Sequence, residues 1–380
     1  MKVVVIGAGS IGSCAALRLA RRGVSVTVVD AQQAGAGLSA HGFGWVNAFD
    51  TESDPYYELS IAALRAHRDL AALTGGEPWF HQTGNLHWAD SAEGAAQLSA
   101  TAERYRARAY SVEEFDAERA GRDLQSGLSV TGLHGPLFHY PADAHVISDR
   151  FVASVQDHAR RSGVTFRTGD AVRDLLGDDQ VRGVLLASGE RIEADAVVLC
   201  AGRGTAELLG RVGAAVPVVE PGDPTATTMG LLVRTSPVNV RVDRILHAPH
   251  LSIRPHTGAR LVLHCHDVDE ELDPGADWAG QGRVAAQRVL ARLADVLPET
   301  AAADVRVESA YVGVRPMPAD RMSVVGWVPD VGALYMLLTH SGLTLAPVLG
   351  EIAAQEVAGE PSTLAVAFRP DRFATTCQGA

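Results

Sequence analysis

Two short apolar runs open the chain, and a stretch with helical spacing separates them. Residues 2–6 (KVVVI) and 24–29 (VSVTVV) are rich in valine, so both predict buried strands. Residues 11–22 carry apolar side chains at the three- and four-residue spacing of a helix. The start of the chain therefore predicts one β–α–β unit.

The pattern changes along the rest of the chain. Residues 145–163 have helical spacing, whereas most runs between residues 164 and 265 alternate or stay apolar in the manner of strands. Residues 283–296 return to helical spacing, and a strand at 333–338 followed by a helix at 342–359 ends the pattern. We expect an α/β (α+β) fold in which a mixed or antiparallel β-sheet domain interrupts a Rossmann-type domain.

Composition excludes several classes of protein. The chain has 380 residues, 47% of them hydrophobic, and its net charge of −12 has the wrong sign for binding nucleic acid. No run of 18 apolar residues occurs, so no membrane span is expected. The N-terminus enters a strand without the pattern of a signal peptide, which favours the cytoplasm. Lys2 is the only lysine, so a catalytic cation would be an arginine or a histidine.

Three glycines stand between the first strand and its helix. Gly7, Gly9 and Gly12 form G-x-G-x-x-G, which allows a tight turn, a close approach to pyrophosphate and close helix–strand packing. Asp30 ends the second strand, where a carboxylate can accept a ribose 2′-OH and would repel the 2′-phosphate of NADP. The alternative is a tight turn without a ligand. The residues predicted to hold a dinucleotide are Gly7, Gly9, Ser10, Ile11, Gly12, Asp30, Ala31 and Gln32.

Two later segments favour a flavin over a nicotinamide. Residues 195–202 (DAVVLCAG) predict a strand that runs into a turn, where Ala201 and Gly202 let the backbone pass close to a cofactor. Residues 334–338 predict a strand that leads into T-H-S-G-L-T-L-A-P, where a second helix starts. A nicotinamide has no need of this helix N-terminus. The N1–C2=O edge of a flavin gains negative charge on reduction, and a helix N-terminus stabilises that charge.

The order of these motifs resembles the superfamily of FAD enzymes that contains D-amino-acid oxidase, glycine oxidase and sarcosine oxidase. The resemblance runs along almost the whole chain, through GAGSIG, Asp30, SAHG, TGNLHWADS, GVTFRTGDAVRDL, ADAVVLCAG, IRPHTGARLVL, YVGVRPMPADRMSVVGWVP and HSGLTLAPVLGE. It implies that residues 39–42 run along the isoalloxazine or the phosphates, that the Val172 backbone meets the adenine side, and that residues 341–344 meet the flavin N1–O2 edge. The implied flavin contacts are Ser39, Ala40, His41, Gly42, Val172, Ala201, Gly202, Arg315, His340, Ser341, Gly342, Leu343 and Thr344.

The resemblance also implies how the chain divides and how FAD is held. The FAD-binding domain would consist of residues 1–80, 141–215 and 311–380, and the substrate domain of residues 81–140 and 216–310. Some relatives hold the flavin covalently, through a cysteine in the C-terminal loop or a histidine in the early turn. The loop here has no cysteine, so non-covalent FAD is expected, with a link through His41 as the alternative.

The activity that the resemblance implies is oxidation of a C–N bond. An amino acid or a related amine would become an imine by hydride transfer to flavin N5, and O₂ would reoxidise the flavin to give hydrogen peroxide. Three alternatives stay open. They are a dehydrogenase with another electron acceptor, a flavin-binding protein without amine turnover, and an NAD-dependent dehydrogenase.

Arg315 is the candidate that would bind a substrate carboxylate. It lies in GVRP at residues 313–316, which matches the G-x-R-P segment that carries the substrate arginine in glycine-oxidase-like enzymes. Its planar guanidinium suits a carboxylate, and the alternative is an ion pair, for instance with Asp320. Leu251 stands where those enzymes carry a tyrosine, and His340 stands in place of a second arginine. Fewer side chains are therefore available to bind the substrate carboxylate than in those enzymes, which leaves open a substrate that is bulkier, N-substituted or not an amino acid.

Four further side chains are candidates near the substrate. His340 borders the predicted flavin edge, where it would bind substrate or, as a cation, assist the reaction with oxygen; the alternative is a structural histidine. Arg254 is either a second substrate contact or a member of a surface ion pair. Trp45 and His247 are expected to line the pocket.

The H-C-H triplet at residues 264–266 is a candidate metal site. On a strand, His264 and His266 would share one face while Cys265 points away. Two ligands without a third nearby make a poor zinc site, so we expect no metal.

Overall fold

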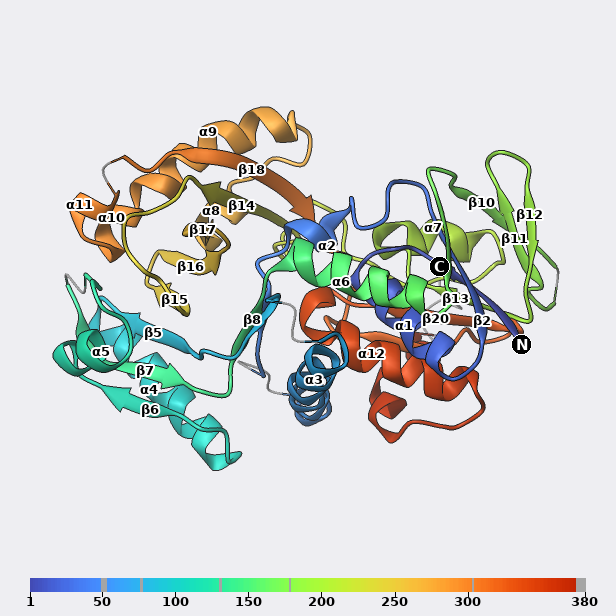
Figure 1. Cartoon of the computed structure of the whole chain (residues 1–380), viewed down its shortest axis with the longest axis horizontal. Coiled ribbons are helices and arrows are strands. Elements are labelled where there is room, and N and C mark those ends of the chain that lie inside the picture. Colours follow the sequence, from blue (N-terminus) through green and yellow to red (C-terminus); the bar gives the residue numbers. More distant parts are fainter. Residues whose placement is uncertain (49–52, 76–77, 130–131, 178, 303, 374–380) are drawn as a thin grey trace.

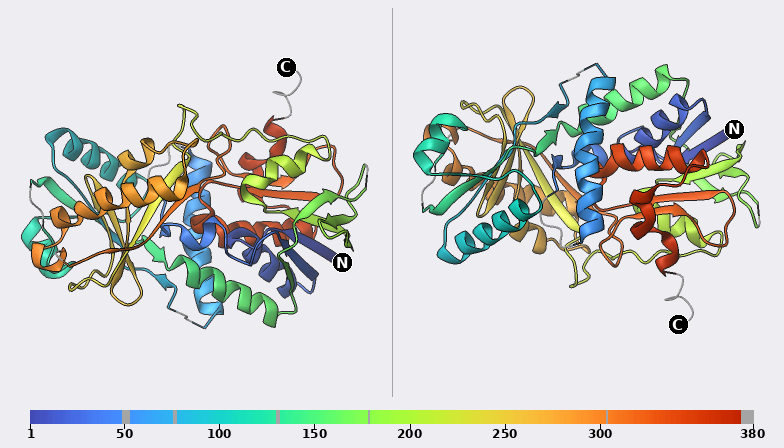
Figure 2. Two further views of the ribbon diagram at one scale, coloured as in Figure 1. Left: turned by 90° about the horizontal axis from the view of Figure 1, so that it is seen from above. Right: turned by 90° about the horizontal axis from the view of Figure 1, so that it is seen from below.

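The structure is a computed structural model that describes residues 1–48, 53–75, 78–129, 132–177, 179–302 and 304–373. Figure 1 shows two lobes side by side, each with a large β-sheet, and Figure 2 shows the same two lobes from above and from below. The colours of Figure 1 show that segments far apart in the sequence build each lobe. The chain therefore crosses between the lobes more than once.

The first large sheet is mostly parallel and has apolar side chains on both faces. Its six strands lie in the order β19 (Val324–Trp327), β20 (Leu334–Leu338), β13 (Ala196–Leu199), β1 (Lys2–Ile6), β2 (Ser25–Asp30) and β9 (Thr165–Thr168). Neighbouring strands run parallel except β19 and β20. Val3 and Val5 of β1 belong to one core, and Val4 and Ile6 belong to another. Both faces are covered, which explains why these strands are apolar along their length.

Different elements cover the two faces of this sheet. One face packs against α1 (Ser10–Arg21), α3 (Asp54–Leu73), α6 (Ser148–Arg161) and α12 (Gly342–Val357). The other face packs against α7 (Thr205–Gly210) and a small antiparallel sheet of β10 (Val172–Leu175), β11 (Gly183–Leu186) and β12 (Arg191–Glu193). Within the first group, α12 lies against both α1 and α3.

The second large sheet forms the other lobe. Its eight strands lie in the order β18 (Val307–Val314), β14 (Met229–Thr235), β17 (Arg260–His264), β16 (Leu251–His256), β15 (Ile245–Ala248), β5 (Asn85–Ala89), β7 (His134–Tyr140) and β6 (Glu113–Phe115). Neighbours are antiparallel except β15 and β5. Helix α9 (Trp278–Ala291) packs on β14 and β18, and α4 (Ala92–Ala107) packs on β5 and β7. Strand β18 ends beside α2 (Leu38–His41), at the junction of the lobes (Figure 1).

The remaining elements are short. A three-stranded sheet consists of β3 (Trp45–Val46), β8 (Ala144–Val146) and β4 (Phe80–His81). The short helices are α5 (Ala117–Asp123), α8 (His266–Glu270), α10 (Leu293–Val296), α11 (Glu299–Ala302) and the 3₁₀ segments Gly202–Gly204, Thr363–Phe368 and Pro370–Phe373. None of the helices in the described part of the chain combines the length and the apolar character that crossing a membrane requires.

The predicted fold class and the opening β–α–β unit are confirmed, whereas several short strands were missed. The sequence pattern did not predict β3, β4, β6, β7, β8, β15 or β19. Six of these strands have two to four residues, too few for a period of two to show, and β7 (HGPLFHY) has glycine and proline near its start. The predicted helix at 283–296 begins earlier, at Trp278, and divides at Arg292 into α9 and α10.

The contact between α1 and α12 allows a test of the fold. A Cβ atom on Gly350 of α12 would lie 2.7 Å from the carbonyl carbon of Cys14 and 2.8 Å from the nitrogen of Ala15 in α1. Both are backbone atoms, so the helices themselves would have to move. We expect Gly350→Ala to lower the free energy of unfolding by about 1–3 kcal/mol, measured by urea denaturation.

Gly121 of α5 is the matched control. A Cβ atom there would meet no atom within 4 Å, so Gly121→Ala is expected to raise the free energy of unfolding by about 0.5–1 kcal/mol through its helix propensity. If both substitutions changed stability alike, the tight contact between α1 and α12 would be refuted.

Candidate functional site

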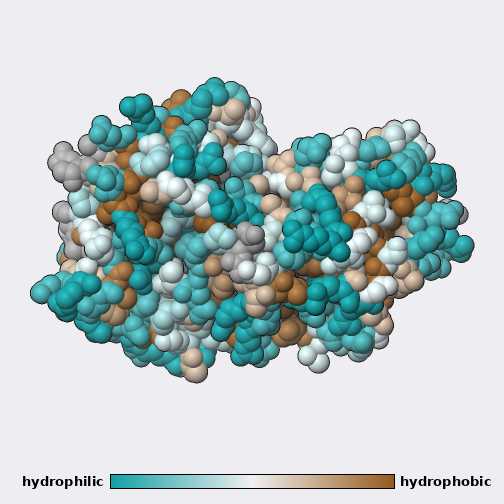
Figure 3. All heavy atoms as spheres, in the orientation of Figure 1, coloured by the Kyte–Doolittle hydropathy of each residue, from teal (hydrophilic) through white to brown (hydrophobic). Residues whose placement is uncertain are grey.

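A cavity of about 1460 Å³ runs from the glycine turn after β1 to the end of β18. It exceeds the roughly 300–1,000 Å³ of an ordinary ligand pocket, as a dinucleotide with a second small molecule requires. The space-filling view in Figure 3 shows an indentation between the lobes at the upper edge of the molecule. The predicted residues that line the cavity are Gly7, Gly9, Ser10, Ile11, Asp30, Ala31, Gln32, Ser39, Gly42, Trp45, Val172, Ala201, Gly202, His247, Arg315, His340, Ser341, Gly342, Leu343 and Thr344.

The glycine turn has the tight geometry that its sequence predicts. Gly7 has a φ of 105°, and a Cβ atom on it would lie 2.3 Å from the carbonyl oxygen of Cys200. Gly12 does not line the cavity; a Cβ atom there would lie 1.9 Å from the oxygen of Gly7, so its role is close packing. Gly9 is the N-cap of α1 and has no side chain that could cap the helix. The Ser10 N–H donates to Ser39 Oγ at 3.0 Å, so the N–H groups that follow it in the first turn are those available to phosphate oxygens.

Asp30 braces the glycine turn from the end of β2. Its Oδ2 accepts the Ala8 N–H at 2.7 Å and its Oδ1 accepts the Gln32 N–H at 2.8 Å. Each carboxylate oxygen has a second acceptor site, so Asp30 can bind a ribose hydroxyl while it keeps these bonds. The ribose contact stays a prediction, and the carboxylate has an additional structural task.

A second helix N-terminus reaches the same cavity. Helix α12 begins at Gly342 directly after β20, and its N-cap, Ser341, makes no side-chain capping bond. Ser10 of α1 donates through its Oγ to the carbonyl oxygen of Gly342 at 3.1 Å. The N-termini of α1 and α12 therefore lie side by side, and together with the glycine turn they suit a ligand with negative charge at two places.

His67 supports the start of α12, and the sequence analysis missed it. It is fully buried in α3, and its Nε2 lies 3.0 Å from the carbonyl oxygens of both Leu343 and Thr344. Burial lowers the pKa of His67 to about 4, so the ring is neutral and Nε2 donates. No sequence signal could find this contact, because its acceptors lie 276 and 277 residues further along the chain.

His340 contacts the cavity from the loop between β20 and α12. Its Nε2 lies 3.1 Å from the carbonyl oxygen of Arg321, and its Nδ1 lies 2.9 Å from Ser341 Oγ. Burial is the main cause that lowers the pKa of His340. A neutral ring is therefore favoured, which argues against a cationic role in the reaction with oxygen.

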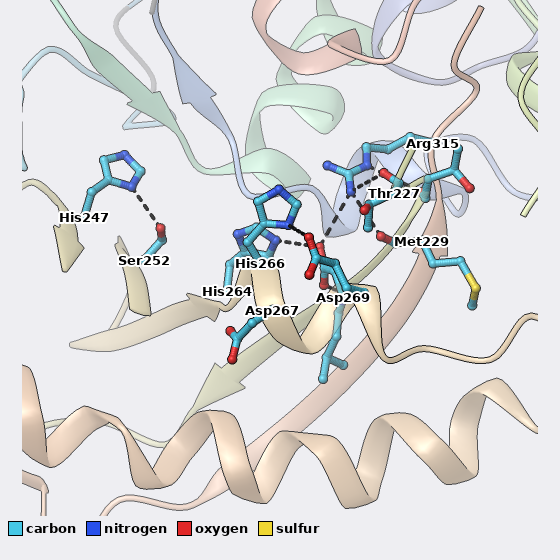
Figure 4. Close-up of polar contacts among 12 residues, drawn as sticks. Thr227, Met229, His247, Ser252, His264, His266, Asp267, Asp269 and Arg315 are labelled. Carbon is cyan, nitrogen blue, oxygen red and sulfur yellow. Dashed lines mark hydrogen bonds and ion pairs between the residues drawn. The ribbon is translucent and has the colours of Figure 1, made fainter. Parts of the chain in front are cut away.

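Arg315 follows β18, and three backbone carbonyls hold its guanidinium (Figure 4). Its Nη2 donates to Thr227 and Met229 at 3.0 Å, and its Nε donates to Thr228 at 3.4 Å. Its Nη1 has no hydrogen-bond partner among the described residues and remains available to a ligand. The suggested ion pair with Asp320 is wrong, because that carboxylate accepts from Arg372 Nε at 2.7 Å.

Asp269 is the acid beside Arg315. Its carboxylate is fully buried and lies 3.6 Å from Arg315 Nη2. The same carboxylate accepts the Leu231 N–H at 2.8 Å and faces His264 Nε2 at 2.8 Å (Figure 4). Neither Asp269 nor this link was predicted, although the D-V-D-E sequence after H-C-H marks an unusually charged segment next to a strand.

Trp45 and His247 form an aromatic part of the wall, as predicted. Their ring centroids are 4.3 Å apart, and His247 Nδ1 lies 2.9 Å from Ser252 Oγ. Trp45 donates through Nε1 to the buried carboxylate of Asp143 at 2.7 Å. Asp143 also accepts from Asn85 at 2.6 Å and from a tyrosine hydroxyl, and burial raises its pKa to about 7. Buried hydrogen bonds thus fix both rings of the wall.

Three predicted contacts lie elsewhere. Arg254 is 2% exposed within β16, where its Nη1 donates to Pro255 O at 2.9 Å and burial lowers its pKa to about 10. It forms no ion pair with any residue that the structure describes, and it does not line the cavity. His41 stacks on Tyr311, with ring centroids 3.9 Å apart, and neither His41 nor its neighbour Ala40 lines the cavity. This position does not favour a covalent link from His41 to flavin.

The H-C-H triplet was expected to lie on one strand, but the structure places it at the junction of a strand and a helix. β17 ends at His264 and α8 begins at His266, so the two rings do not share a strand face. The part of the chain that the structure describes contains no group of three His, Cys, Asp or Glu residues placed to hold a metal ion.

Comparison with known proteins identifies relatives of this chain. A glycine oxidase from Pseudomonas aeruginosa is 27% identical over 380 residues, which cover 94% of this chain and 95% of that protein. A tRNA 5-methylaminomethyl-2-thiouridine biosynthesis bifunctional protein from Ralstonia nicotianae is 28% identical, but the matched part, 97% of this chain, spans only 60% of its length.

Solved structures share the fold along nearly the whole chain. Glycine oxidase from Geobacillus kaustophilus superposes with a TM-score of 0.83 and 21% identity, covering 97% of this chain and 98% of that one. Iminodiacetate oxidase from a Chelativorans species superposes with a TM-score of 0.79 and 26% identity, with the same coverage. The model of the family described as "FAD dependent oxidoreductase" matches residues 2–356. The chain therefore belongs to the FAD-dependent oxidoreductase family.

Proposed function

We propose that this protein oxidises the C–N bond of an amino acid or a related amine to an imine. The observation that supports the proposal most is that one cavity joins the glycine turn, the N-terminus of α12 and the free Nη1 of Arg315. Bound FAD would supply the two-electron oxidation, as it does in this family. The rest of the task is to hold cofactor and substrate in one orientation.

The residues of this chain that would hold FAD lie at both helix N-termini. N–H groups at the start of α1 would bind the pyrophosphate, and those at the start of α12 would face the flavin N1–C2=O edge. Val172 would meet the adenine side, and Asp30 the ribose. In this proposal, residues 1–80, 141–215 and 311–380 form the FAD-binding domain, and residues 81–140 and 216–310 form the substrate domain.

Arg315 would bind the substrate carboxylate through its free Nη1. The carbonyls of Thr227, Thr228 and Met229 fix the guanidinium plane, so little side-chain entropy is lost when the anion binds. Leu251 adds an apolar wall where glycine-oxidase-like enzymes carry a tyrosine. This wall supports a substrate with an N-substituent or a larger carbon chain. The likeness to iminodiacetate oxidase, whose name denotes an N-substituted glycine, is consistent with that class.

We further propose O₂ as the electron acceptor, with hydrogen peroxide as the product. Relatives include oxidases and also a D-amino acid dehydrogenase from Methylobacterium radiotolerans, which is 29% identical over 229 residues. The competing acceptor is therefore a quinone or a carrier protein. The cytoplasmic location stays a prediction.

Bleaching of the flavin tests the activity. The purified holoprotein is expected to be yellow, acid precipitation is expected to release FAD into the supernatant, and at least one compound among glycine, iminodiacetate, N-methylglycine, D-alanine and L-proline is expected to bleach the flavin without oxygen. Spectrophotometry follows the bleaching, and a peroxidase assay in air detects hydrogen peroxide.

The test can separately contradict the amine turnover, the role of O₂ as acceptor and the non-covalent binding of the flavin. If none of these compounds or a wider set of amines bleached the flavin, the protein would be a flavin-binding protein without amine turnover. Bleaching without peroxide in air would refute O₂ as the acceptor. Yellow colour that stays with the precipitate would show a covalent link.

Substitution of Arg315 tests the carboxylate contact. Arg315→Leu is expected to raise the dissociation constant of the bleaching amino acid about 10- to 150-fold, because a charge-assisted hydrogen bond of about 1.5–3 kcal/mol is lost. Arg315→Lys should keep only part of the affinity that Arg315→Leu loses, since lysine lacks the planar guanidinium. Anaerobic titration of the flavin spectrum measures the constant, and the absorbance ratio at 280 and 450 nm measures flavin content.

Arg372→Leu is the control for loss of an arginine. Arg372 binds Asp320 and does not line the cavity, so substrate affinity should stay unchanged. Unchanged affinity in Arg315→Leu at full flavin content would show that Arg315 is only structural. Loss of flavin from that variant would show that it supports the cofactor site.

A further inference from the structure

His264 and Asp269 form a buried acid–imidazole pair in the wall of the cavity. His264 ends β17, Asp269 lies on α8, and both line the same cavity as Arg315. The distance from His264 Nε2 to Asp269 Oδ2 is 2.8 Å, and Figure 4 shows the two side chains pointing toward one another. Neither residue has a task in the proposed function so far.

The surroundings of Asp269 fix its orientation. Its side chain is fully buried, its Oδ1 accepts the Leu231 N–H at 2.8 Å, and its Oδ2 is shared between His264 and Arg315. A Cβ atom on Gly230 would lie 3.2 Å from the same Oδ2, so the glycine lets the carboxylate approach the backbone of β14 closely. A buried carboxylate needs its donors, which makes this arrangement costly to break.

The pairing sets the tautomer of His264. A carboxylate can only accept a hydrogen bond from the imidazole, so in the neutral ring the hydrogen is on Nε2 and the lone pair is on Nδ1. Nδ1 has no hydrogen-bond partner among the described residues, and the side chain is 24% exposed. An acceptor is therefore available on a ring that lines the cavity.

We propose that His264 Nδ1 accepts the ammonium proton of the amine substrate, and that Asp269 is the positioning residue for this base. The proposal rests on the proposed function. Arg315 binds the carboxylate end of the substrate, and the shared Asp269 carboxylate sets a fixed relation between this anion site and the base. The substrate class is thus an amino acid or N-substituted amino acid that arrives as its ammonium form.

The step conserves atoms and charge. One N–H bond of the ammonium group breaks, its electron pair stays on nitrogen, and the proton bonds to His264 Nδ1. The Cα–H bond then breaks with its electron pair going to the oxidised flavin, and the nitrogen lone pair forms the C=N bond. Water hydrolyses the iminium product, and His264 returns its proton to solvent. Without the first proton transfer, nitrogen has no lone pair and the C=N bond cannot form.

The charges that face His264 come from several elements. Asp269 on α8 pairs with His264, and His247 on β15 interacts with it electrostatically; the other charged groups in the same cavity wall are Asp267, His266 and Glu270 of α8 and Arg315 after β18. Asp267 accepts two hydrogen bonds from Arg292 at 2.6 and 2.7 Å, and His266 lies 3.9 Å from Glu270, so both point to other partners. This difference provides matched control positions.

His264→Gln is the variant that removes the base. A glutamine amide can still donate to Asp269, but it cannot take up a proton at neutral pH. The limiting rate of anaerobic flavin reduction by the compound that bleaches best is expected to fall about 10²-fold at pH 7. The difference in rate between His264→Gln and the unmodified protein should shrink about tenfold for each unit that the pH is raised, because the solution itself then deprotonates the amine. The dissociation constant should change much less, because Arg315 keeps Asp269.

Asp269→Asn tests the positioning role. An asparagine can still accept the Leu231 N–H through its oxygen, but its amide donates toward His264 and favours the tautomer with hydrogen on Nδ1. The same loss of rate at pH 7 and the same recovery at high pH are expected. His266→Gln and Asp267→Asn, the same substitutions at neighbouring positions, should keep the pH dependence of the unmodified protein.

A measurement that does not depend on turnover checks the pairing itself. Nitrogen NMR of the holoprotein labelled with ¹⁵N-histidine should show the His264 hydrogen on Nε2, with the signal assigned by its absence from His264→Gln. In Asp269→Asn the hydrogen should move to Nδ1. This readout stays valid if no amine reduces the flavin, in which case the proposed function fails and the pairing is judged separately.

Three outcomes would overturn the proposal. One is a limiting reduction rate in His264→Gln that follows pH as in the unmodified protein. Another is a ¹⁵N spectrum in which His264 carries its hydrogen on Nδ1 before any substitution. A pH effect shared by the His266→Gln and Asp267→Asn controls would equally refute it, because it would then reflect the general charge of the wall.

Discussion

The close contact between α1 and α12 is the constraint on which the cavity depends. Gly350 leaves no room for a Cβ atom beside Cys14, and Ser10 donates to the carbonyl oxygen of Gly342 at 3.1 Å. Two helix N-termini, which carry partial positive charge of the same sign, are therefore held side by side. Apolar packing holds this arrangement, and an anionic ligand at the two termini would stabilise it further.

Two buried carboxylates organise the opposite wall of the cavity in a similar way. Asp269 binds Arg315 and His264, and Asp143 binds Trp45 and Asn85. A carboxylate without water must find its donors within the protein, so each of these donors is kept in one orientation. Arg315, His264 and Trp45 in the cavity wall are therefore each oriented by a buried acid that lies behind them.

Local patterns predicted the glycine turn and the helix N-terminus after β20, both of which line the cavity. The roles of Gly7, Gly9 and Gly12 can be inferred from about a dozen adjacent residues, because a turn and a helix N-terminus are local structures. The strand and helix around Ser341 are equally local, and their function follows from the same physics of the helix terminus. The substrate half was predicted less completely. Arg315 was identified through a resemblance of its neighbours. Arg254 was expected either to contact the substrate or to join a surface ion pair, but it is buried and does not line the cavity.

The sequence by itself determined the fold class, the family of cofactor and the glycine turn, because strand and helix periods and turn chemistry depend on neighbouring residues. Tertiary structure alone decided which groups meet in the cavity. His67 reaches Leu343 across 276 residues, Trp45 reaches Asp143 across 98, and Asp269 joins β14 to the end of β18. Such contacts depend on how strands are ordered in a sheet, and no period in the chain encodes that order. The partner of a buried polar side chain is therefore a property of the fold, even where the side chain itself is evident in the sequence.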